Sequence, residues 1–268
     1  MPPLSLTTAC AGKTALVTGA SSGLGMEFAR QLAAAGCQLI LVARRQDRLE
    51  SLRQELQTRH QIRVDVIPAD LADPDSPPRL YAEIQRRAIT VDVLINNAGF
   101  GLYGEFLSVP WPREREMLAV DLLAVVHLTK LFAAQMAARK SGQILLISSI
   151  GAYQPSPTYA VYSAAKTFIL FFGEALHYEL RATGVNCTVV SPGITATDFL
   201  AVAGQAQSRF QRLTMMTSAQ VVRIALRAMV RRRPSCVPGL INGVLTWATR
   251  LVPRQLAAAI TYRLMTVR

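Results

Sequence analysis

Residues 14–35 read TALVTGASSGLGMEFARQLAAA, and this stretch decides the fold that we expect. Thr14 to Val17 form a short apolar run typical of a strand, and Gly25 to Ala35 have the spacing of a helix. The turn between them, TGASSGLG, spaces three glycines as G-x-x-x-G-x-G. Glycines in such a turn let a phosphate approach the backbone and the free N–H groups of the helix. The stretch predicts a dinucleotide site, although a tight connection alone would also use glycines.

The alternation of strand-like and helix-like segments continues along the chain. Further strands are expected at 38–42, 62–67, 91–95, 143–148 and 185–191, and helices at 47–58, after Pro78, at 112–138 and at 159–181. Such alternation specifies an α/β fold, a doubly wound and mostly parallel sheet with helices on both faces. No repeat or low-complexity linker interrupts it. We therefore predict a single domain, with a core at 1–237 and an amphipathic C-terminal extension at 238–268.

Composition excludes several other classes of protein. Of the 268 residues, 51% are apolar and 17% charged, which suits a globular core. The four cysteines form no C-x-x-C pair and the three histidines have no ligand-like spacing, so we expect neither a metal site nor disulfides. We also expect no signal peptide and no transmembrane helix, because no uninterrupted apolar run of about 18 residues occurs. We therefore predict a reducing, cytoplasmic location. Within it, the protein is either free in solution or attached to a membrane surface.

The net charge of +12 lies almost wholly in the last quarter of the chain. Residues 1–198 carry 18 Lys and Arg against 17 Asp and Glu, whereas residues 199–268 carry 11 Arg and no acidic residue. The densest cluster, Arg231 to Arg233, suits the negative end of a helix, and an anionic membrane is the second interpretation. Because the rest of the chain is nearly neutral, we expect no nucleic-acid partner.

Polar motifs stand where the predicted strands end, the side on which open parallel sheets bind their ligands. They are Asp70-Leu71, Asn96-Asn97-Ala98-Gly99, Ser148-Ser149, Pro192-Gly193 and, opening a helix, Tyr162-Ser163-Ala164-Ala165-Lys166. With TGASSGLG, this ordered set resembles the short-chain dehydrogenase/reductase family from Lys13 to about Val237. The resemblance implies a Rossmann-type sheet, a nicotinamide dinucleotide cofactor, oxidoreductase activity and a homo-oligomer.

Tyr162 and Lys166 are four residues apart on a helix and so share one face. An ammonium near a phenol stabilises the phenolate, which predicts a lowered pKa for Tyr162 and proton exchange with a carbonyl or alcohol oxygen. The family resemblance implies that Ser149 is the catalytic hydroxyl and that Lys166 also binds the nicotinamide ribose. Ser149 would hold the reacting oxygen by a hydrogen bond.

Asp121 departs from the family pattern, which usually has an asparagine in the long central helix. An aspartate can still accept the hydrogen bonds of a proton relay. As an anion it can also pair with Lys166 and offset the effect of that lysine on Tyr162. The third interpretation is a helix residue with no catalytic part.

Arg44 and Arg45 follow the second predicted strand, with no acidic residue before Asp47. Cations at this place suit the 2′-phosphate of NADP(H), and we expect Arg44 to be the main contact unless both are ordinary surface charges. Thr197 matches a family position near the cofactor and also suits a helix N-cap. By resemblance, the cofactor-binding residues are Gly19, Ser21, Ser22, Gly23, Leu24, Gly25, Arg44, Asp70, Leu71, Asn97, Ala98, Gly99, Tyr162, Lys166, Pro192, Gly193 and Thr197.

The segments expected to border the substrate are apolar. They contribute Phe100, Tyr103, Tyr153, Phe199, Phe210, Met215 and Met216. These side chains favour a hydrophobic carbonyl or alcohol, although they would also suit packing against the domain.

The C-terminal extension mixes apolar residues and a tryptophan with arginines, so it docks on its own domain, on a second subunit, or on an anionic membrane surface. Two functions remain open for the whole chain. The first is a catalytic NADP(H) oxidoreductase. The second is a catalytically weak dinucleotide-binding regulatory or scaffold protein on the same fold.

Overall fold

Six predicted strands lie in one parallel sheet, and a seventh extends its edge. The computed structural model of the chain describes residues 5–196, 202–205 and 215–266. The strands are β1 (Thr14–Thr18), β2 (Gln38–Ala43), β3 (Val64–Pro68), β4 (Val93–Asn96), β5 (Gly142–Ile147), β6 (Val185–Val190) and β7 (Ser235–Cys236). Their order is β3-β2-β1-β4-β5-β6-β7, and each neighbouring pair is parallel. The predicted doubly wound α/β fold is confirmed.

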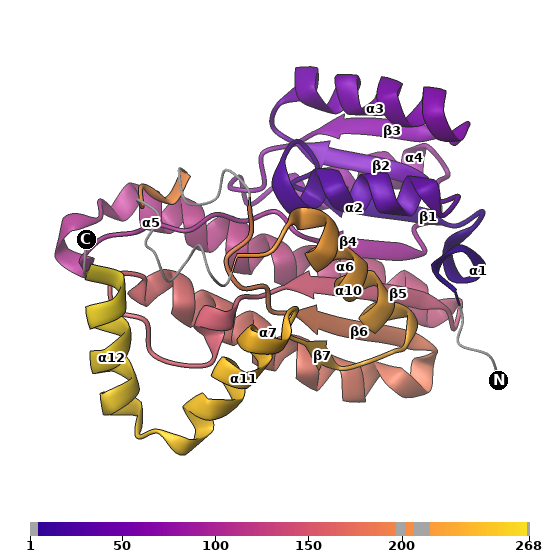
Figure 1. Cartoon of the computed structure of the whole chain (residues 1–268). Helices are drawn as coiled ribbons and strands as arrows, with labels where there is room; N and C mark the ends of the chain where they lie inside the picture. The colour runs from indigo at the N-terminus through magenta and orange to yellow at the C-terminus, as the bar shows by residue number, and fades with distance from the viewer. Residues whose placement is uncertain (1–4, 197–201, 206–214, 267–268) are drawn as a thin grey trace.

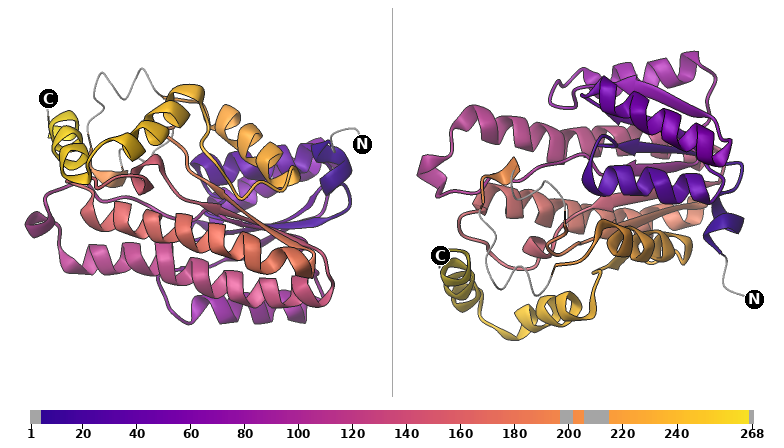
Figure 2. Two further views of the ribbon diagram at one scale, coloured as in Figure 1. Left: turned by 90° about the horizontal axis from the view of Figure 1, so that it is seen from below. Right: turned by 45° about the horizontal axis from the view of Figure 1, so that its top comes forward.

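Helices cover both faces of this sheet (Figures 1 and 2). One layer contains α2 (Gly23–Ala34), α3 (Gln46–His60) and α10 (Ser218–Val230), and the other contains α4 (Ser76–Arg86), α6 (Ala124–Ala138) and α7 (Ala160–Leu180). Neighbouring residues of a strand face opposite layers: Ala15 and Val17 pack with the first, and Leu16 with the second. Because both faces are covered, the central strands are apolar at nearly every position.

The remaining elements lie mostly at the carboxyl ends of the strands or beyond the last strand. They are α1 (Leu6–Cys10), η1 (Phe106–Ser108), α5 (Trp111–Leu118), η2 (Ala119–Leu123), η3 (Ile150–Ala152), η4 (Arg181–Thr183), α11 (Leu240–Ala248), η5 (Thr249–Leu251) and α12 (Arg254–Thr266). The predicted C-terminal extension therefore folds as two helices. They project from the body of the domain beyond β7 (Figure 1).

The helical stretch Trp111–Ala138, formed by α5, η2 and α6, is long and apolar enough by composition to cross a membrane. The apolar side of this stretch packs against the rest of the domain. Val125, Leu128 and Phe132 are buried in the core layer of α4 and α7, and the Phe132 ring meets the Tyr81 ring edge-on at 5.3 Å. Core packing thus accounts for these apolar residues.

Candidate active site

The glycine-rich turn between β1 and α2 packs tightly against the turn after β4. Gly19 and Gly23 have φ angles of 68° and 53°, which favour glycine. A Cβ on Gly25 would lie 2.2 Å from the Gly19 carbonyl oxygen, and one on Gly19 would lie 2.9 Å from the Ala98 Cα. The packing of the chain itself therefore requires Gly19 and Gly25, in addition to the predicted room for a phosphate.

The turn leads directly into the N-terminus of α2. Its N-cap residue, Ser22, makes no side-chain capping hydrogen bond, so the first N–H groups of the helix have no side-chain acceptor there. Such groups, together with the helix dipole, favour an anion. The pyrophosphate of a dinucleotide fits a turn with these donors.

Thr18, the last residue of β1, fastens the glycine-rich turn to the segment after β4. Its hydroxyl accepts hydrogen bonds from the backbone N–H groups of Asn97 and Ala98, both at 3.0 Å, and donates to the Ile95 carbonyl at 3.3 Å. The Asn97 side chain in turn donates to the Thr18 carbonyl at 2.9 Å. Two motifs some 80 positions apart in the chain therefore form one rigid wall at the carboxyl end of the sheet.

The two arginines after β2 have different partners. Arg45 Nη2 donates to Ser21 Oγ at 3.1 Å, so its guanidinium lies on the glycine-rich turn. Arg44 pairs with Glu116 at 3.0 Å, and 61% of its side chain is exposed. The sequence favoured Arg44 as the main phosphate contact, whereas in the structure Arg45 is the cation joined to the turn.

Ser149, Tyr162 and Lys166 come together where β5 meets α7. Ser149 forms a hydrogen bond with the Tyr162 phenol, and its Oγ accepts the Gly151 N–H at 3.1 Å. Lys166 Nζ lies 5.6 Å from the centre of the Tyr162 ring and donates to the Ile147 carbonyl at 3.2 Å. The structure thus brings together the hydroxyl, the phenol and the ammonium that the sequence predicted as a unit.

Asp121 completes this cluster from η2, a single π-helical turn between α5 and α6. One carboxylate oxygen, Oδ2, lies 3.0 Å from Lys166 Nζ, and the other, Oδ1, accepts the Phe100 N–H at 2.9 Å. A Cβ on Gly99 would lie 2.7 Å from Oδ1, so the segment after β4 closes over the carboxylate. Irregular turns of this kind are frequent at functional sites. Of the interpretations that the sequence left open, this geometry favours the ion pair with Lys166.

The electrostatics of the phenol differ from the sequence-based expectation. Burial raises the pKa of Tyr162, and the negative charge of Asp121 raises it further, while the Ser149 hydrogen bond acts in the opposite direction. Burial also raises the pKa of the Asp121 carboxyl, which the Lys166 ammonium opposes. Because Lys166 is paired with an anion, the phenol faces both charges and receives little net stabilisation of its phenolate.

Aromatic rings extend from Tyr162 toward the predicted substrate side. The Tyr159 ring lies 5.7 Å from the Tyr162 ring, and the Tyr103 ring lies 5.5 Å from the Tyr159 ring. The sequence predicted Tyr103 on this side but missed Tyr159. Its position three residues before Tyr162, at the N-cap of the same helix, was the available signal.

Other predicted substrate residues are more scattered. Phe100 lies under the guanidinium of Arg113, at 5.4 Å from ring centre to Cζ. Met216 pairs with the segment after β6 through hydrogen bonds with Ile194 and Ala196. Phe199 and Phe210 lie outside the described residues.

Pro192 and Gly193, after β6, close the site from the side of the C-terminal helices. The Pro192 carbonyl accepts the Ile150 N–H at 3.0 Å. A Cβ on Gly193 would lie 2.4 Å from Nδ2 of Asn242, a residue of α11. The predicted cofactor segment after β6 is therefore packed directly against α11. Thr197 lies outside the described residues.

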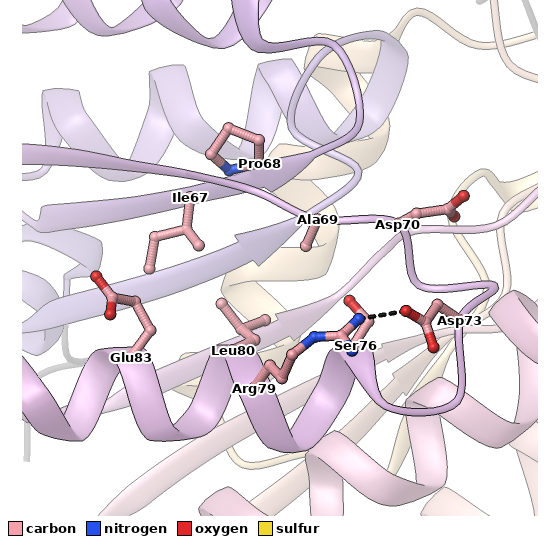
Figure 3. Close-up of a pocket in the computed structure, with 9 residues that line it drawn as sticks. All are labelled: Ile67, Pro68, Ala69, Asp70, Asp73, Ser76, Arg79, Leu80 and Glu83. Atoms are coloured by element: carbon pink, nitrogen blue, oxygen red, sulfur yellow. Dashed lines mark hydrogen bonds and ion pairs between the residues drawn. The ribbon is translucent and has the colours of Figure 1, made fainter.

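Asp70 and Leu71 follow β3, at the edge of the site remote from Tyr162 in the strand order. Asp70 Oδ1 accepts the Ala72 N–H at 3.0 Å. Asp70 also borders a cavity of about 430 Å³ between β3 and α4, shown in Figure 3. In that view the Asp70 carboxylate points away from the Asp73–Arg79 ion pair. The cluster around Tyr162 does not line this cavity.

No group of three or more His, Cys, Asp or Glu residues suited to a metal ion occurs within the described ranges. His177 lies in α7, where its Nδ1 is 2.9 Å from the Cys187 carbonyl oxygen. That contact is a packing contact between α7 and β6.

Comparison with known proteins agrees with the fold. The sequence profile of the short chain dehydrogenase family matches residues 13–208. A dehydrogenase/reductase SDR family protein 7-like of Drosophila melanogaster is 30% identical over 251 residues, covering 89% of this chain and 76% of that protein. The very-long-chain 3-oxoacyl-CoA reductase of Homo sapiens is 34% identical over 192 residues, covering 69% of this chain and 60% of the reductase.

Among solved structures, a short-chain dehydrogenase from Sphingobium yanoikuyae in complex with NADPH is similar with a TM-score of 0.80 and 27% identity. The match covers 90% of this chain and 96% of that one. The chain therefore belongs to the short-chain dehydrogenase/reductase family. It is a member of a family of oxidoreductases that bind a nicotinamide dinucleotide and a small-molecule substrate.

Proposed function

We propose that this protein is an NADP(H)-dependent oxidoreductase that reduces the carbonyl group of a hydrophobic small molecule, or oxidises the matching secondary alcohol. The observation that carries the proposal is the cluster in which Ser149 bonds the Tyr162 phenol beside the buried Lys166 ammonium. A hydroxyl, a phenol and a cation at the carboxyl end of a parallel sheet are the groups that proton transfer to a carbonyl oxygen requires.

In this reaction Ser149 holds the carbonyl oxygen by a hydrogen bond, and Tyr162 donates its proton to that oxygen as charge develops there. Lys166 is the cation beside the phenolate that remains, its effect reduced by its pairing with Asp121, and Asp121 fixes the position of the ammonium. When bound, the nicotinamide supplies the hydride that the carbonyl carbon accepts. In the direction of oxidation, the phenolate of Tyr162 takes the proton from the alcohol.

The proposed cofactor is NADP(H). The glycine-rich turn and the first turn of α2 would hold its pyrophosphate, and Arg45 on Ser21, with Arg44 nearby, would meet the 2′-phosphate. The relative from Sphingobium yanoikuyae, which was solved with NADPH, supports this preference. Asn97 to Gly99, Pro192, Gly193 and Lys166 would border the rest of the cofactor.

The proposed substrate is a ketone with an apolar body. The rings of Tyr162, Tyr159 and Tyr103 follow one another, and Tyr153 is half-buried at the end of η3. Such a wall suits apolar substituents around a polar carbonyl. The human relative is named for reducing a 3-oxo group on a very long acyl chain, which agrees with this substrate class.

We also propose that the protein is a homo-oligomer that associates through α7. Phe168, Phe171 and Tyr178 lie on this helix with 44%, 65% and 62% of their surfaces exposed. An apolar stripe of this size on a folded domain favours contact with a second subunit. Light scattering of the wild type and of a Phe171→Arg variant tests the assignment, because the variant should dissociate and so have the lower molar mass in solution.

Turnover with a panel of apolar ketones and NADPH tests the function. Consumption of NADPH that depends on the ketone supports the enzyme. The alternative, a regulatory protein that binds the dinucleotide with little turnover, is favoured by one observation, the Asp121 charge beside Tyr162. Tight NADPH binding without consumption of any ketone or alcohol would select that alternative.

A further inference from the structure

The two C-terminal helices turn their large apolar side chains away from the protein. The buried residues of α11 are Asn242 and Thr246, and those of α12 are Ala257 and Thr261. The outward side, called here the C-terminal apolar face, consists of Leu240, Val244, Trp247, Leu256, Ile260 and Leu264, which are 46% to 86% exposed. Helices that rest on a domain and face water have the opposite arrangement. This face therefore requires an apolar partner.

Specific contacts hold both helices in this orientation. The Asn242 side chain donates to the Pro238 carbonyl at 3.0 Å and packs on Gly193. At the other end, the Tyr103 hydroxyl donates to the Met265 carbonyl at 3.2 Å. The small and polar residues thus point inward because they bond and pack there, which fixes the apolar residues on the outside.

Arginines accompany the apolar face. Arg250, Arg254 and Arg263 are exposed, and none of them forms an ion pair with another described residue. Residues 199–268 contain no acidic residue that could offset them. The partner of this face therefore combines an apolar interior with negative charge.

A second copy of this chain does not meet that requirement. A two-fold contact places the same patch on both sides of the interface, which would bring arginines against arginines with no carboxylate from residues 199–268 between them. An anionic lipid bilayer offers both features, since its headgroups meet the arginines and its acyl boundary accepts tryptophan, leucine and isoleucine.

The face lies beside the series of aromatic rings that leads to Tyr162. Tyr103, which bonds α12, also belongs to the series of rings that leads to Tyr162. The Tyr262 hydroxyl of α12 lies 3.1 Å from Glu105, next to the 63% exposed Phe106. A bilayer in contact with α12 would therefore lie at the substrate side of the domain.

We propose that the C-terminal apolar face, with Arg250, Arg254 and Arg263, docks on the surface of an anionic lipid bilayer. The docked protein receives its ketone substrate from the lipid phase along the Tyr103 side of the site. This second part rests on the proposed function, whereas the docking itself does not.

Flotation of the full chain with vesicles measures the docking directly. Vesicles of equal parts phosphatidylcholine and phosphatidylglycerol should carry the protein, and pure phosphatidylcholine vesicles should carry much less. In a Trp111→Phe variant, whose remaining tryptophan is Trp247, the fluorescence should shift to the blue on binding. An unchanged spectrum, or equal binding to both vesicle types, overturns the proposed face.

Matched variants test whether vesicle binding depends on the arginines of this face or only on the positive net charge of the protein. Changing Arg250, Arg254 and Arg263 to Gln should weaken anionic-vesicle binding by about 100-fold, because each basic residue near such a surface contributes roughly fivefold. The control changes Arg48, Arg59 and Lys130 to Gln, three exposed cations on α3 and α6, and should bind like the wild type. Equal losses in both sets overturn the proposal.

A second variant tests the apolar part. Val244→Ser with Trp247→Ser changes two residues that are 57% and 59% exposed, so the fold should survive. Lost vesicle binding at an unchanged thermal midpoint supports docking. A wild-type dimer that this variant dissociates, with no vesicle binding by the wild type, identifies the face as a subunit contact and overturns docking.

Activity separates the two parts of the proposal. A ketone dissolved in anionic vesicles should be reduced faster by the wild type than by the arginine variant, while both reduce a water-soluble ketone equally. Vesicle binding without any turnover leaves the docking face established and overturns the lipid route together with the proposed function.

Discussion

Lys166 Nζ lies 3.0 Å from Asp121 Oδ2 inside the protein, with 6% of the lysine side chain and none of the aspartate side chain exposed. The ammonium that would stabilise the Tyr162 phenolate is therefore already paired with an anion. An asparagine, the residue usual in the family, would leave that ammonium with its full charge. Asp121 should accordingly control the basicity of Tyr162.

Burial and the Asp121 charge both raise the pKa of Tyr162, and we expect Asp121→Asn to lower this pKa because it removes the second of these causes. Reduction uses the protonated phenol and declines as the pH rises through this pKa, whereas oxidation uses the phenolate and increases there. Both limbs should move to lower pH in the variant. Oxidation at mildly alkaline pH should become roughly tenfold faster, as expected for the loss of one neighbouring charge.

Rates in both directions, measured from neutral to strongly alkaline pH, check this prediction. Asp121→Leu is the control, because it shows what is lost when Asp121 no longer supports the structure at all. It leaves the buried Lys166 ammonium without a counter-ion and the Phe100 N–H without an acceptor, and should cost about 3–5 kcal/mol of unfolding free energy. Identical pH profiles for the wild type and Asp121→Asn would exclude control of Tyr162 by this charge.

Tyr162→Phe should remove the proton donor while leaving the aromatic ring in place. Since general acid catalysis contributes about 10²- to 10⁴-fold, turnover should fall within that range. NADPH affinity, measured by fluorescence titration, should change little, because the aromatic ring is retained. A variant that turns over at the wild-type rate would remove Tyr162 as the proton donor.

The sequence was sufficient for six of the seven strands because each of those six was marked twice, by an apolar run and by the polar motif at its end, whereas the short β7 carries neither mark. It also suggested that Asp121 is near Lys166, but the register of a long helix is uncertain by a residue or two. The π-helical turn that aims Asp121 at Lys166 shifts that register and leaves no pattern in the sequence. The pKa direction of Tyr162 depended on this pair, so it could not be predicted.

The roles of the two arginines and the orientation of the C-terminal helices also depend on the three-dimensional path of the chain and could not be predicted from the sequence. Arg44 and Arg45 are equivalent in sequence, and only the path of the backbone decides that Arg45 bonds Ser21 while Arg44 pairs with Glu116. The C-terminal helices were recognised as amphipathic, but periodicity does not tell which face meets the protein. The contacts of Asn242 and Tyr103 decide that.

The contact between Arg45 and Ser21 predicts how the two arginines divide cofactor selectivity. Arg45→Ala should weaken NADPH binding by about 10- to 100-fold, the range for a lost hydrogen bond to a charged group, and NADH binding only slightly. Arg44→Ala, its matched control, removes a side chain that is 61% exposed and should have the smaller effect. Titrations of both variants with both cofactors check the order. A larger loss of NADPH affinity in Arg44→Ala would reverse the assignment.

The close approach of Gly99 to Asp121 predicts a position where one methyl group is not tolerated. A Cβ on Gly99 would lie 2.7 Å from Asp121 Oδ1, so Gly99→Ala should displace the carboxylate and destabilise the protein by about 1–3 kcal/mol. Turnover should fall as well, because Asp121 positions Lys166. The matched control is Gly243→Ala in α11, where a Cβ meets nothing within 4 Å. Alanine is the better helix former by roughly 1 kcal/mol, so this variant should be slightly more stable. Chemical denaturation of both variants decides the matter, since equal stabilities would mean that the segment after β4 yields easily and does not hold Asp121 in place.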